Sequence, residues 1–256
     1  RRSSDLAEDL VAMRDTVNAG TSAGLTFKLM NDIDLSSVCG PSLGSWTAIG
    51  NQSNPFRGSF DGQGYTISNL YVTGSDTYAG LFGNANGNGT RAIGDPGIRN
   101  VVVKGTVDYS GSGYAGGVIG AMRGGPFTIE NVGNEVNVTS ANGQAGGVVG
   151  YVYGSGGQVT IRGCYNKGNV QSYARYSYAG GIASQIQTYM NEQEYGFVLE
   201  NCYNQGEVYS GRYMGGITSS WYVNGTSKVT AANLYSTAEI YSDGNYSCAL
   251  IGPWNA

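Results

Sequence analysis

The feature that most constrains the fold is a repeat of short apolar and glycine-rich blocks along most of the chain. An asparagine column can be aligned at Asn69, Asn100, Asn131, Asn201 and Asn233, with Gly163 in its fourth position. Successive intervals in this column are 31, 31, 32, 38 and 32 residues. Seven residues after the column, five consecutive units carry Val107, Val138, Val170, Val208 and Ile240. Such a period predicts that equivalent residues of successive units lie directly above one another.

Two further blocks follow the same alignment. An apolar residue stands two positions before each member of the asparagine column, at Ile67, Ile98, Ile129, Ile161, Leu199 and Ala231. The AGLFG block from Ala79 aligns with GGVIG from Gly116, GGVVG from Gly146, GGIAS from Gly180, GGITS from Gly215 and CALIG from Cys248. With β-branched columns and few helix signals, this period predicts an all-β fold, a right-handed parallel β-helix of about six coils stacked about 4.8 Å apart.

Stacked coils explain the asparagines and the glycines. Identical amides one coil apart can donate and accept hydrogen bonds along the axis. Paired glycines allow a positive φ or a close backbone approach at a corner. Two neighbouring columns also alternate in charge, one with Arg99, Glu130, Arg162 and Glu200, the other with Lys104, Glu135 and Lys167. Opposite charges on adjacent strands favour this register by about 0.2 to 1 kcal/mol per pair.

One helix is expected ahead of the repeats. Residues 5–18 place Leu6, Leu10, Met13 and Val17 on one face, and Asp5 with Glu8 has the spacing of a capping box. A solenoid has an open edge at each end, so this helix is predicted to cap the first coil. We expect one continuous structural domain, with the cap and first coil in residues 1–65 and the repeats in residues 66–256.

Composition restricts the partners. Among 256 residues there are 43 Gly and 20 Tyr, only 12% are charged, and the net charge is −4. The basic residues form no stripe that could neutralise phosphates, so nucleic acid is not an expected partner. No window reaches the roughly 18 apolar residues of a membrane span, and no signal-peptide pattern follows Arg1. A soluble, trimmed chain with no membrane insertion in this segment is therefore expected.

Cysteine usage argues against a metal site. Cys39, Cys164, Cys202 and Cys248 lack CxxC spacing, and the chain contains no histidine, so neither a metal nor a cofactor is predicted. Cys164 and Cys202 occupy equivalent positions on adjacent coils. Parallel stacking keeps their Cβ atoms further apart than a disulfide requires, so buried free thiols are expected.

The glycine blocks AGLFG, GGVIG and GGVVG resemble the GLUG-type repeats of bacterial cell-surface proteins, and FRGSFDGQGYTISNL (56–70) is similar to the segment that precedes them. That family includes large secreted adhesins and non-catalytic regions of surface immunoglobulin A peptidases, mostly from host-associated bacteria. The resemblance implies a β-helix at the cell surface and says little about activity. The chain departs from the pattern at Ser184 and Ser219, which replace the closing glycine, and at Gly163.

A search for catalytic residues yields one weak pair and excludes one activity. The HExxH zinc motif of the peptidases cannot occur in a chain without histidine. Many parallel β-helices act on polysaccharides, and Glu207 and Glu239 fall in the same column on adjacent coils. Their carboxylates would then lie about 5 Å apart, as in retaining glycosidases. Two solvated carboxylates on a surface strand are the simpler interpretation, and no catalytic residue is assigned.

Tyrosines give the best indication of a binding surface. Tyr165, Tyr203 and Tyr235 share one position on three successive coils, and Tyr209 and Tyr241 share another. Tyrosine has a rigid apolar face and a polar tip, which suit protein contacts and stacking on sugar rings. The alternative is the ordinary preference of tyrosine for strands. Further aromatic residues are assigned to inserted loops, at Tyr173, Tyr176, Tyr178, Tyr189, Tyr195 and Trp221, and we include Trp221 in the predicted site.

The sequence thus favours a non-enzymatic, extracellular segment of a longer bacterial surface protein, with neighbouring domains. Its predicted role is adhesion, through binding of a host glycan or a host or extracellular protein. Two alternatives stay open, a polysaccharide-degrading enzyme that uses Glu207 and Glu239 and a passive structural stalk.

Overall fold

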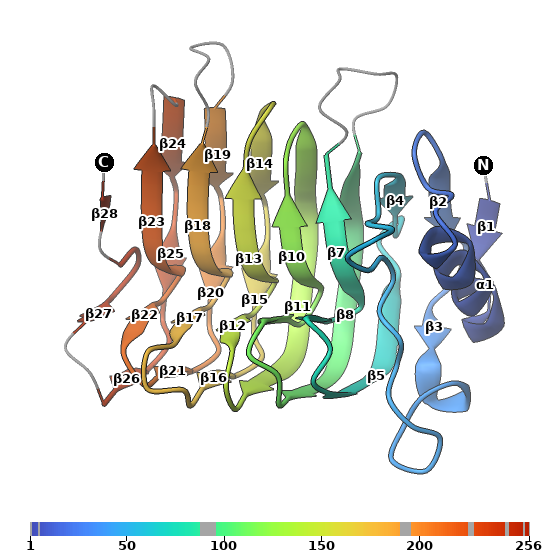
Figure 1. The fold of residues 1–256 in the computed structure, drawn as a ribbon, viewed down its shortest axis with the longest axis horizontal. Helices are drawn as coiled ribbons and strands as arrows, with labels where there is room; N and C mark the ends of the chain where they lie inside the picture. Colours follow the sequence, from blue (N-terminus) through green and yellow to red (C-terminus); the bar gives the residue numbers. More distant parts are fainter. Residues whose placement is uncertain are drawn as a thin grey trace.

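The chain, described by a computed structural model at residues 2–4, 6–87, 96–189, 196–224, 228–243, 246–252 and 254–255, forms a row of stacked β-coils (Figure 1). It is a β-solenoid of about six turns with parallel sheets, which confirms the predicted parallel β-helix. One α-helix, α1 (Ala7–Asn18), lies at the N-terminal end of the row (Figure 1). A short 3-10 turn (Leu35–Ser37) follows in the first coil.

The strands belong to three sheets, and every pair of named strands among the described residues is parallel. The large sheet follows the path β1 (Arg2–Ser4), β2 (Thr26–Leu29), β4 (Ser59–Asp61), β8 (Gly97–Tyr109), β11 (Phe127–Ser140), β14 (Val159–Arg162), β19 (Gly196–Glu200) and β24 (Lys228–Ala232). Beside this path it contains β3 (Ile33–Asp34), β5 (Thr66–Gly74), β15 (Tyr165–Asn166), β16 (Val170–Ser172), β20 (Tyr203–Asn204), β21 (Val208–Ser210), β25 (Tyr235–Ser236) and β26 (Ile240–Ser242).

Two smaller sheets complete each coil. The β9 sheet contains β6 (Tyr78–Ala79), β9 (Tyr114–Gly116), β12 (Gln144–Gly146), β17 (Tyr178–Gly180), β22 (Tyr213–Gly215) and β27 (Tyr246–Cys248). The β10 sheet contains β7 (Phe82–Asn86), β10 (Ile119–Arg123), β13 (Val149–Gly154), β18 (Ala183–Tyr189), β23 (Thr218–Asn224) and β28 (Trp254–Asn255). A coil therefore runs through the large sheet, the β9 sheet and the β10 sheet in turn.

The register confirms the repeat alignment from β8 onward. Ile129 pairs with Ile98 on one side and with Ile161 on the other, and Ile161 pairs with Leu199. These four side chains are fully buried, so the column forms part of the core. The valine column is in register from Val72 to Ile240.

The alignment was wrong in the first coil. Phe60, and not Ile67, pairs with Ile98, while Ile67 pairs with Val103. The physical reason is a tight turn after Phe60, in which Gln63 and Gly64 have φ of 52° and 87°. This turn adds residues between the two strands, so that Ile67 is carried further around the coil. The AGLFG block is shifted at its start only, because Ala79 pairs with Ala115 and not with Gly116, whereas Phe82 pairs with Ile119 as predicted.

The asparagine column has a conformational cause that the sequence alignment did not reveal. Asn100, Asn131, Asn201 and Asn233 all have φ between 53° and 55°, and Gly163 in the same column has φ of 64°. Asparagine and glycine are the residues that adopt this left-handed conformation most readily. The predicted amide ladder is also present, since Asn131 Nδ2 donates to Asn100 Oδ1 (3.2 Å) and Asn233 Nδ2 donates to Asn201 Oδ1 (2.9 Å). Asn69 lies outside it and donates to Asp34 Oδ1 (2.7 Å).

A second, buried ladder accounts for the paired glycines. Asn134 Nδ2 donates to Asn166 Oδ1, and Asn166 Nδ2 donates to Asn204 Oδ1, both at 2.7 Å. All three side chains are fully buried. A Cβ on Gly147 would lie 2.5 Å from Asn166 Cγ, and one on Gly117 would contact Asn134 Oδ1. The glycine after each corner is therefore required by close approach to this ladder.

The helix begins one residue later than predicted. Leu6 is the N-cap, with its N–H donating to Asp9 Oδ2 at 3.2 Å, and it is 62% exposed. Leu6 is therefore not part of the buried face, which consists of Ala7, Leu10, Met13 and Val17. Asp5 of the predicted capping box lies outside the described residues.

Both charge ladders are formed as predicted. Glu130 lies between Arg99 (3.9 Å) and Arg162 (2.8 Å), and Arg162 also reaches Glu200 (3.7 Å).

Cys164 and Cys202 are buried and form no disulfide, which confirms the expected free thiols.

Candidate functional site

The tyrosines predicted from the large sheet form a stacked ladder. The Tyr165 and Tyr203 rings lie 5.4 Å apart at 11°, and the Tyr203 and Tyr235 rings lie 5.1 Å apart at 7°. Beneath them, a Cβ on Gly133 would lie 2.5 Å from Tyr165 Oη, so the Tyr165 ring covers this glycine. Both faces of Tyr203 and Tyr165 are therefore covered by the chain. Tyr235, which is 50% exposed, is the member with an outer face left open among the described residues.

Tyr165 also contacts the neighbouring charge ladder of Lys104, Glu135 and Lys167. Its hydroxyl lies 3.4 Å from Glu135 Oε1, and the Lys167 ammonium lies 5.0 Å from the centre of its ring. Burial, followed by the Glu135 carboxylate, raises the pKa of Tyr165 to about 12. The hydroxyl is thus held as a protonated donor within the ladder.

Tyr209 and Tyr241 pair across β21 and β26, as the alignment predicts. The Tyr209 hydroxyl donates to Asp243 Oδ2 at 2.6 Å, and this hydrogen bond raises the pKa of Tyr209. Tyr241 is 48% exposed. The Tyr173 ring lies 5.3 Å from that of Tyr209, so the second predicted column adjoins the loop that contains Tyr173.

Trp221 was assigned to the wrong environment. It lies within β23, is fully buried, and packs edge-on against Phe197 with ring centres 5.0 Å apart. Its full burial makes it a core residue rather than a loop residue. Tyr178 and Tyr189 also lie in strands, and Tyr195 lies outside the described residues.

Glu207 and Glu239 occupy neighbouring coils, because Val208 N–H donates to the Glu239 carbonyl at 3.0 Å. Both residues are exposed. Glu207 Oε2 lies 3.5 Å from Asn169 Nδ2, a surface contact. In the described part of the chain, no three His, Cys, Asp or Glu residues are grouped so that they could hold a metal ion.

A third tyrosine ladder, which the sequence alignment missed, runs along the β9 sheet. Tyr178 stacks on Tyr213 at 4.6 Å and 10°, and Tyr213 stacks on Tyr246 at 4.9 Å and 22°. Earlier coils place Tyr78 and Tyr114 in the same column. Its signal in the sequence is a tyrosine two residues before the glycine block in most units.

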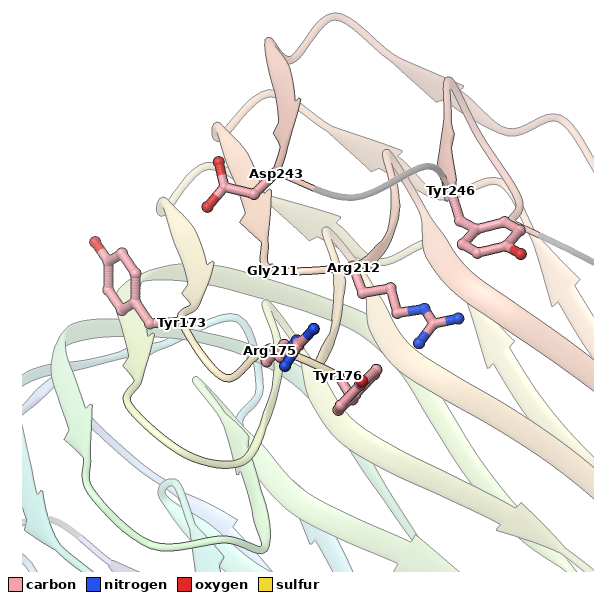
Figure 2. Close-up of a pocket in the computed structure, with 7 residues that line it drawn as sticks. All are labelled: Tyr173, Arg175, Tyr176, Gly211, Arg212, Asp243 and Tyr246. Atoms are coloured by element: carbon pink, nitrogen blue, oxygen red, sulfur yellow. The ribbon is translucent and has the colours of Figure 1, made fainter.

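A pocket of about 610 Å³ opens where this ladder meets the large sheet (Figure 2). We call it the Arg–Tyr pocket, and it is lined by Tyr173, Arg175, Tyr176, Gly211, Arg212, Asp243 and Tyr246. These residues come from the corners of three successive coils, between β16 and β17, between β21 and β22, and between β26 and β27, with Tyr246 as the first residue of β27.

Unequal loop lengths create the Arg–Tyr pocket. Five residues separate Ser172 from Tyr178 at one corner, whereas two separate Ser210 from Tyr213 on the next coil. The short loop lies directly over the long one, since a Cβ on Gly211 would contact the Ala174 carbonyl oxygen. The long loop therefore projects beyond the short one and forms one wall of the recess.

Arginine side chains lie across the aromatic rings of the pocket. The Arg212 guanidinium lies 4.9 Å from the ring centre of Tyr176, 5.1 Å from that of Tyr213 and 5.6 Å from that of Tyr246. Figure 2 shows it between the Tyr176 and Tyr246 rings. Arg175 lies 5.4 Å from the Tyr176 ring centre. Cation–π contacts of this kind orient a guanidinium that would otherwise be flexible.

Buried serines hold the two loops together. Ser177 Oγ lies 3.0 Å from Ser210 Oγ, and Ser210 Oγ donates to the Ser177 carbonyl at 3.0 Å. The Arg212 N–H in turn donates to Ser210 Oγ at 3.3 Å. Because Ser177 and Ser210 are 3% and 0% exposed, these bonds are shielded from water and fix the loops relative to each other.

Sequence reasoning named Tyr173 and Tyr176 as loop aromatics but missed Arg175, Arg212 and Tyr246. A signal was present, because Arg175–Tyr176 and Arg212–Tyr213 stand just before the glycine blocks of adjacent coils. The unequal loop lengths hid it, since the two arginines are not in the same alignment column.

The stacked coils, the parallel sheets and the terminal helix place the chain in the class of parallel β-helices. No family model matches the chain, so the GLUG resemblance stays a prediction from the sequence. Over 130 residues the chain is 32% identical to a protein of Evansella cellulosilytica named "Putative Gly-rich membrane protein". That match covers 50% of this chain and 14% of the relative.

Among solved structures, the chain is similar to a crystal structure described as "a putative immunoglobulin A1 protease from Bacteroides ovatus". The TM-score is 0.66 at 20% sequence identity, and the match covers 99% of this chain and 82% of the other. At this identity the likeness shows the fold alone. Among the described residues, no helix has the length and apolar character needed to cross a bilayer.

Proposed function

We propose that this chain is a ligand-binding segment of a larger bacterial surface protein and that the Arg–Tyr pocket binds a glycan. The observation that carries the proposal is a 610 Å³ recess in which exposed tyrosine rings lie beside oriented arginine side chains. Tyr176 and Tyr246 are 60% and 42% exposed. Aromatic faces of this kind stack on the apolar faces of sugar rings, while hydroxyl and guanidinium groups bond to sugar oxygens.

The names of the similar proteins support a location at the cell surface. The relative from Evansella cellulosilytica is named a membrane protein and is far longer than its match to this chain, which covers 14% of it. A solenoid suits a segment within a long surface protein, because each coil contacts only its neighbours and projects its corners into solvent.

Glycan-array binding tests the proposed function. The intact chain is expected to bind a subset of glycans, and Tyr176→Ala is expected to weaken binding at least about tenfold through loss of ring stacking. Tyr235→Ala is the matched control, because Tyr235 is 50% exposed and lies outside the pocket. Loss of binding with Tyr235→Ala alone would instead assign the ligand to the large-sheet ladder. An array without any signal, together with no binding to serum proteins, would support the passive stalk.

The proposed activity is binding without catalysis. Glu207 and Glu239 are both exposed, and Glu207 Oε2 lies 3.5 Å from Asn169 Nδ2, which supports their interpretation as two surface carboxylates. No release of reducing sugar is expected from pectin, alginate or mucin glycans. Release that disappears in Glu207→Gln would overturn the non-enzymatic role.

A further inference from the structure

We infer that the Arg–Tyr pocket selects glycans that carry an acidic group, a carboxylate or a sulfate, next to a sugar ring. This inference rests on the proposed glycan binding and adds the ligand's chemical class. It follows from the charges that line the pocket, from the way the Arg212 guanidinium is held, and from the aromatic rings around it.

The lining of the pocket is cationic in a chain with few cations. Arg175 and Arg212 line it, while the chain as a whole has only 14 Lys and Arg and a net charge of −4. Asp243 is the single acidic residue of the lining, and its Oδ2 already accepts a hydrogen bond from Tyr209 at 2.6 Å. Figure 2 shows its carboxylate on the opposite side of the pocket from the Arg212 guanidinium.

Two arginines of the large sheet are placed differently. Arg99 and Arg162 lie in the charge ladder of the large sheet, within 4 Å of glutamates on adjacent coils, at 3.9 Å and 2.8 Å from Glu130. Their charge is thus compensated along the stack. Arg175 and Arg212 lie instead beside tyrosine rings, which favour a cation at these positions.

The orientation of Arg212 suits an oxyanion. A guanidinium is planar, and two of its five N–H donors match the spacing of carboxylate or sulfate oxygens, while the aromatic rings beside it fix the direction of this plane. The hydrogen bond from the backbone N–H of Arg212 to Ser210 Oγ (3.3 Å) and the Ser177–Ser210 contact (3.0 Å) fix the loop that presents the guanidinium. Little ordering is therefore left to occur on binding.

The rings specify what surrounds the acidic group. Tyr176 and Tyr246 flank the guanidinium, so the oxyanion of a ligand would lie beside an aromatic face (Figure 2). An acidic sugar offers an oxyanion and an apolar ring face within one residue, and pockets of about 300 to 1,000 Å³ accommodate ligands of that size. An acidic peptide offers the oxyanion on a flexible chain with no ring face, so the glycan is favoured.

Calorimetric titration of the intact chain with sialyllactose, sulfated lactose and lactose tests the inference. At least one acidic probe is expected to bind at least about tenfold more tightly than lactose, and added salt is expected to weaken it. The two acidic probes distinguish a carboxylate from a sulfate. Arg212→Gln is expected to remove the preference, and Arg212→Lys, which keeps the charge and loses the planar fork, is expected to retain part of it.

Arg162→Gln is the matched control, because it makes the same charge change in the ladder of the large sheet and should leave probe affinity unchanged. Gly211→Ala tests the pocket without changing its charge. The added methyl would displace the Ala174 carbonyl and separate the two loops, so this variant should weaken binding of the acidic probes. Circular dichroism checks that each variant retains its β-structure.

The outcomes separate the two proposals. Equal affinity for lactose and both acidic probes, unchanged by Arg212→Gln, would overturn acid selectivity and leave glycan binding intact. Tight binding of oligoglutamate together with no binding of any saccharide would overturn both in favour of a peptide ligand. No binding of these probes, with a blank glycan array, would overturn the proposed function itself.

Discussion

At the scale of single residues, asparagine performs two different tasks in this chain. On the outside, Asn100 and Asn131 take a left-handed corner with φ of 54° and 53° and bond to each other. Inside, Asn134, Asn166 and Asn204 adopt a ladder in which each amide also bonds to the carbonyl two residues ahead, at 2.7 to 3.0 Å. Asn166, the central member of the buried ladder, forms hydrogen bonds with the asparagines of both neighbouring coils. Its substitution should therefore lower stability more than that of Asn134 or Asn204.

Asn166→Ala should therefore destabilise the chain by about 2 to 4 kcal/mol, because three buried hydrogen bonds are lost. Asn142→Ala is the control, since this exposed asparagine donates one hydrogen bond, to the Ser110 carbonyl at 2.9 Å, and its loss should cost less than about 1 kcal/mol. Chemical denaturation measures both values. Equal effects of the two substitutions would contradict a stabilising role for the buried ladder.

At the scale of strands, side chains that repeat from coil to coil lock the register. Glu135 lies between Lys104 (2.9 Å) and Lys167 (3.6 Å), and Tyr165, Tyr203 and Tyr235 stack beside them. A shift by one residue would break both ladders at once and turn buried side chains outward. Packing along the stack thus accounts for the rings, and the proposed binding site lies elsewhere, where loops of unequal length interrupt the stacking.

The Glu135 ladder predicts a pH-dependent stability. The hydrogen bond with Lys104, with further support from Lys167, lowers the pKa of Glu135 below its ordinary value of 4.5. Its contribution is therefore fully present above that ordinary value and is lost as the pH falls through the lower, folded-state pKa. Glu135→Gln should lower stability by about 0.5 to 1 kcal/mol at pH 7, and the difference from the unsubstituted chain should shrink below about pH 4.

Thermal unfolding of both proteins between pH 7 and pH 3 measures this difference. Asp108→Asn, at an exposed position on β8, provides a control for removal of one negative charge. A difference for Glu135→Gln that stays constant across this range would show that the ladder does not depend on the carboxylate charge.

At the scale of the whole molecule, the coils differ in how well they are covered. Helix α1 lies at the N-terminal end, where Leu10 and Val17 are fully buried against the first coil (Figure 1). At the other end, Val229, Leu234, Ile240 and Leu250 are only partly buried. In the described residues, β24, β25 and β26 each pair on one side only.

Amide hydrogen exchange on this 256-residue chain should therefore be graded along the axis. Amides of β8 and β11 should exchange at least about tenfold more slowly than those of β24 and β26, because local opening needs least energy where a coil has a single neighbour. Mass spectrometry of peptic fragments measures the gradient. Uniform protection across all coils would indicate unfolding as one cooperative unit.

The sequence by itself determined the stacking. A period near 31 residues, β-branched columns and alternating charges located the pairs Ile98–Ile129–Ile161–Leu199 and Lys104–Glu135–Lys167 correctly. These features follow from identity between coils, since each side chain meets its own equivalent. The stacked Tyr165, Tyr203 and Tyr235 were also found for this reason.

Only the tertiary structure decided what lies where coils are unequal. The turn after Phe60 displaced Ile67, and the strand pattern buried Trp221. Arg175 and Arg212 meet around Tyr176 because a five-residue loop lies beneath a two-residue loop. Alignment compares equivalent positions, whereas contacts between non-equivalent positions depend on how far each loop projects. That is why the repeat predicts the scaffold and the folded chain reveals the pocket.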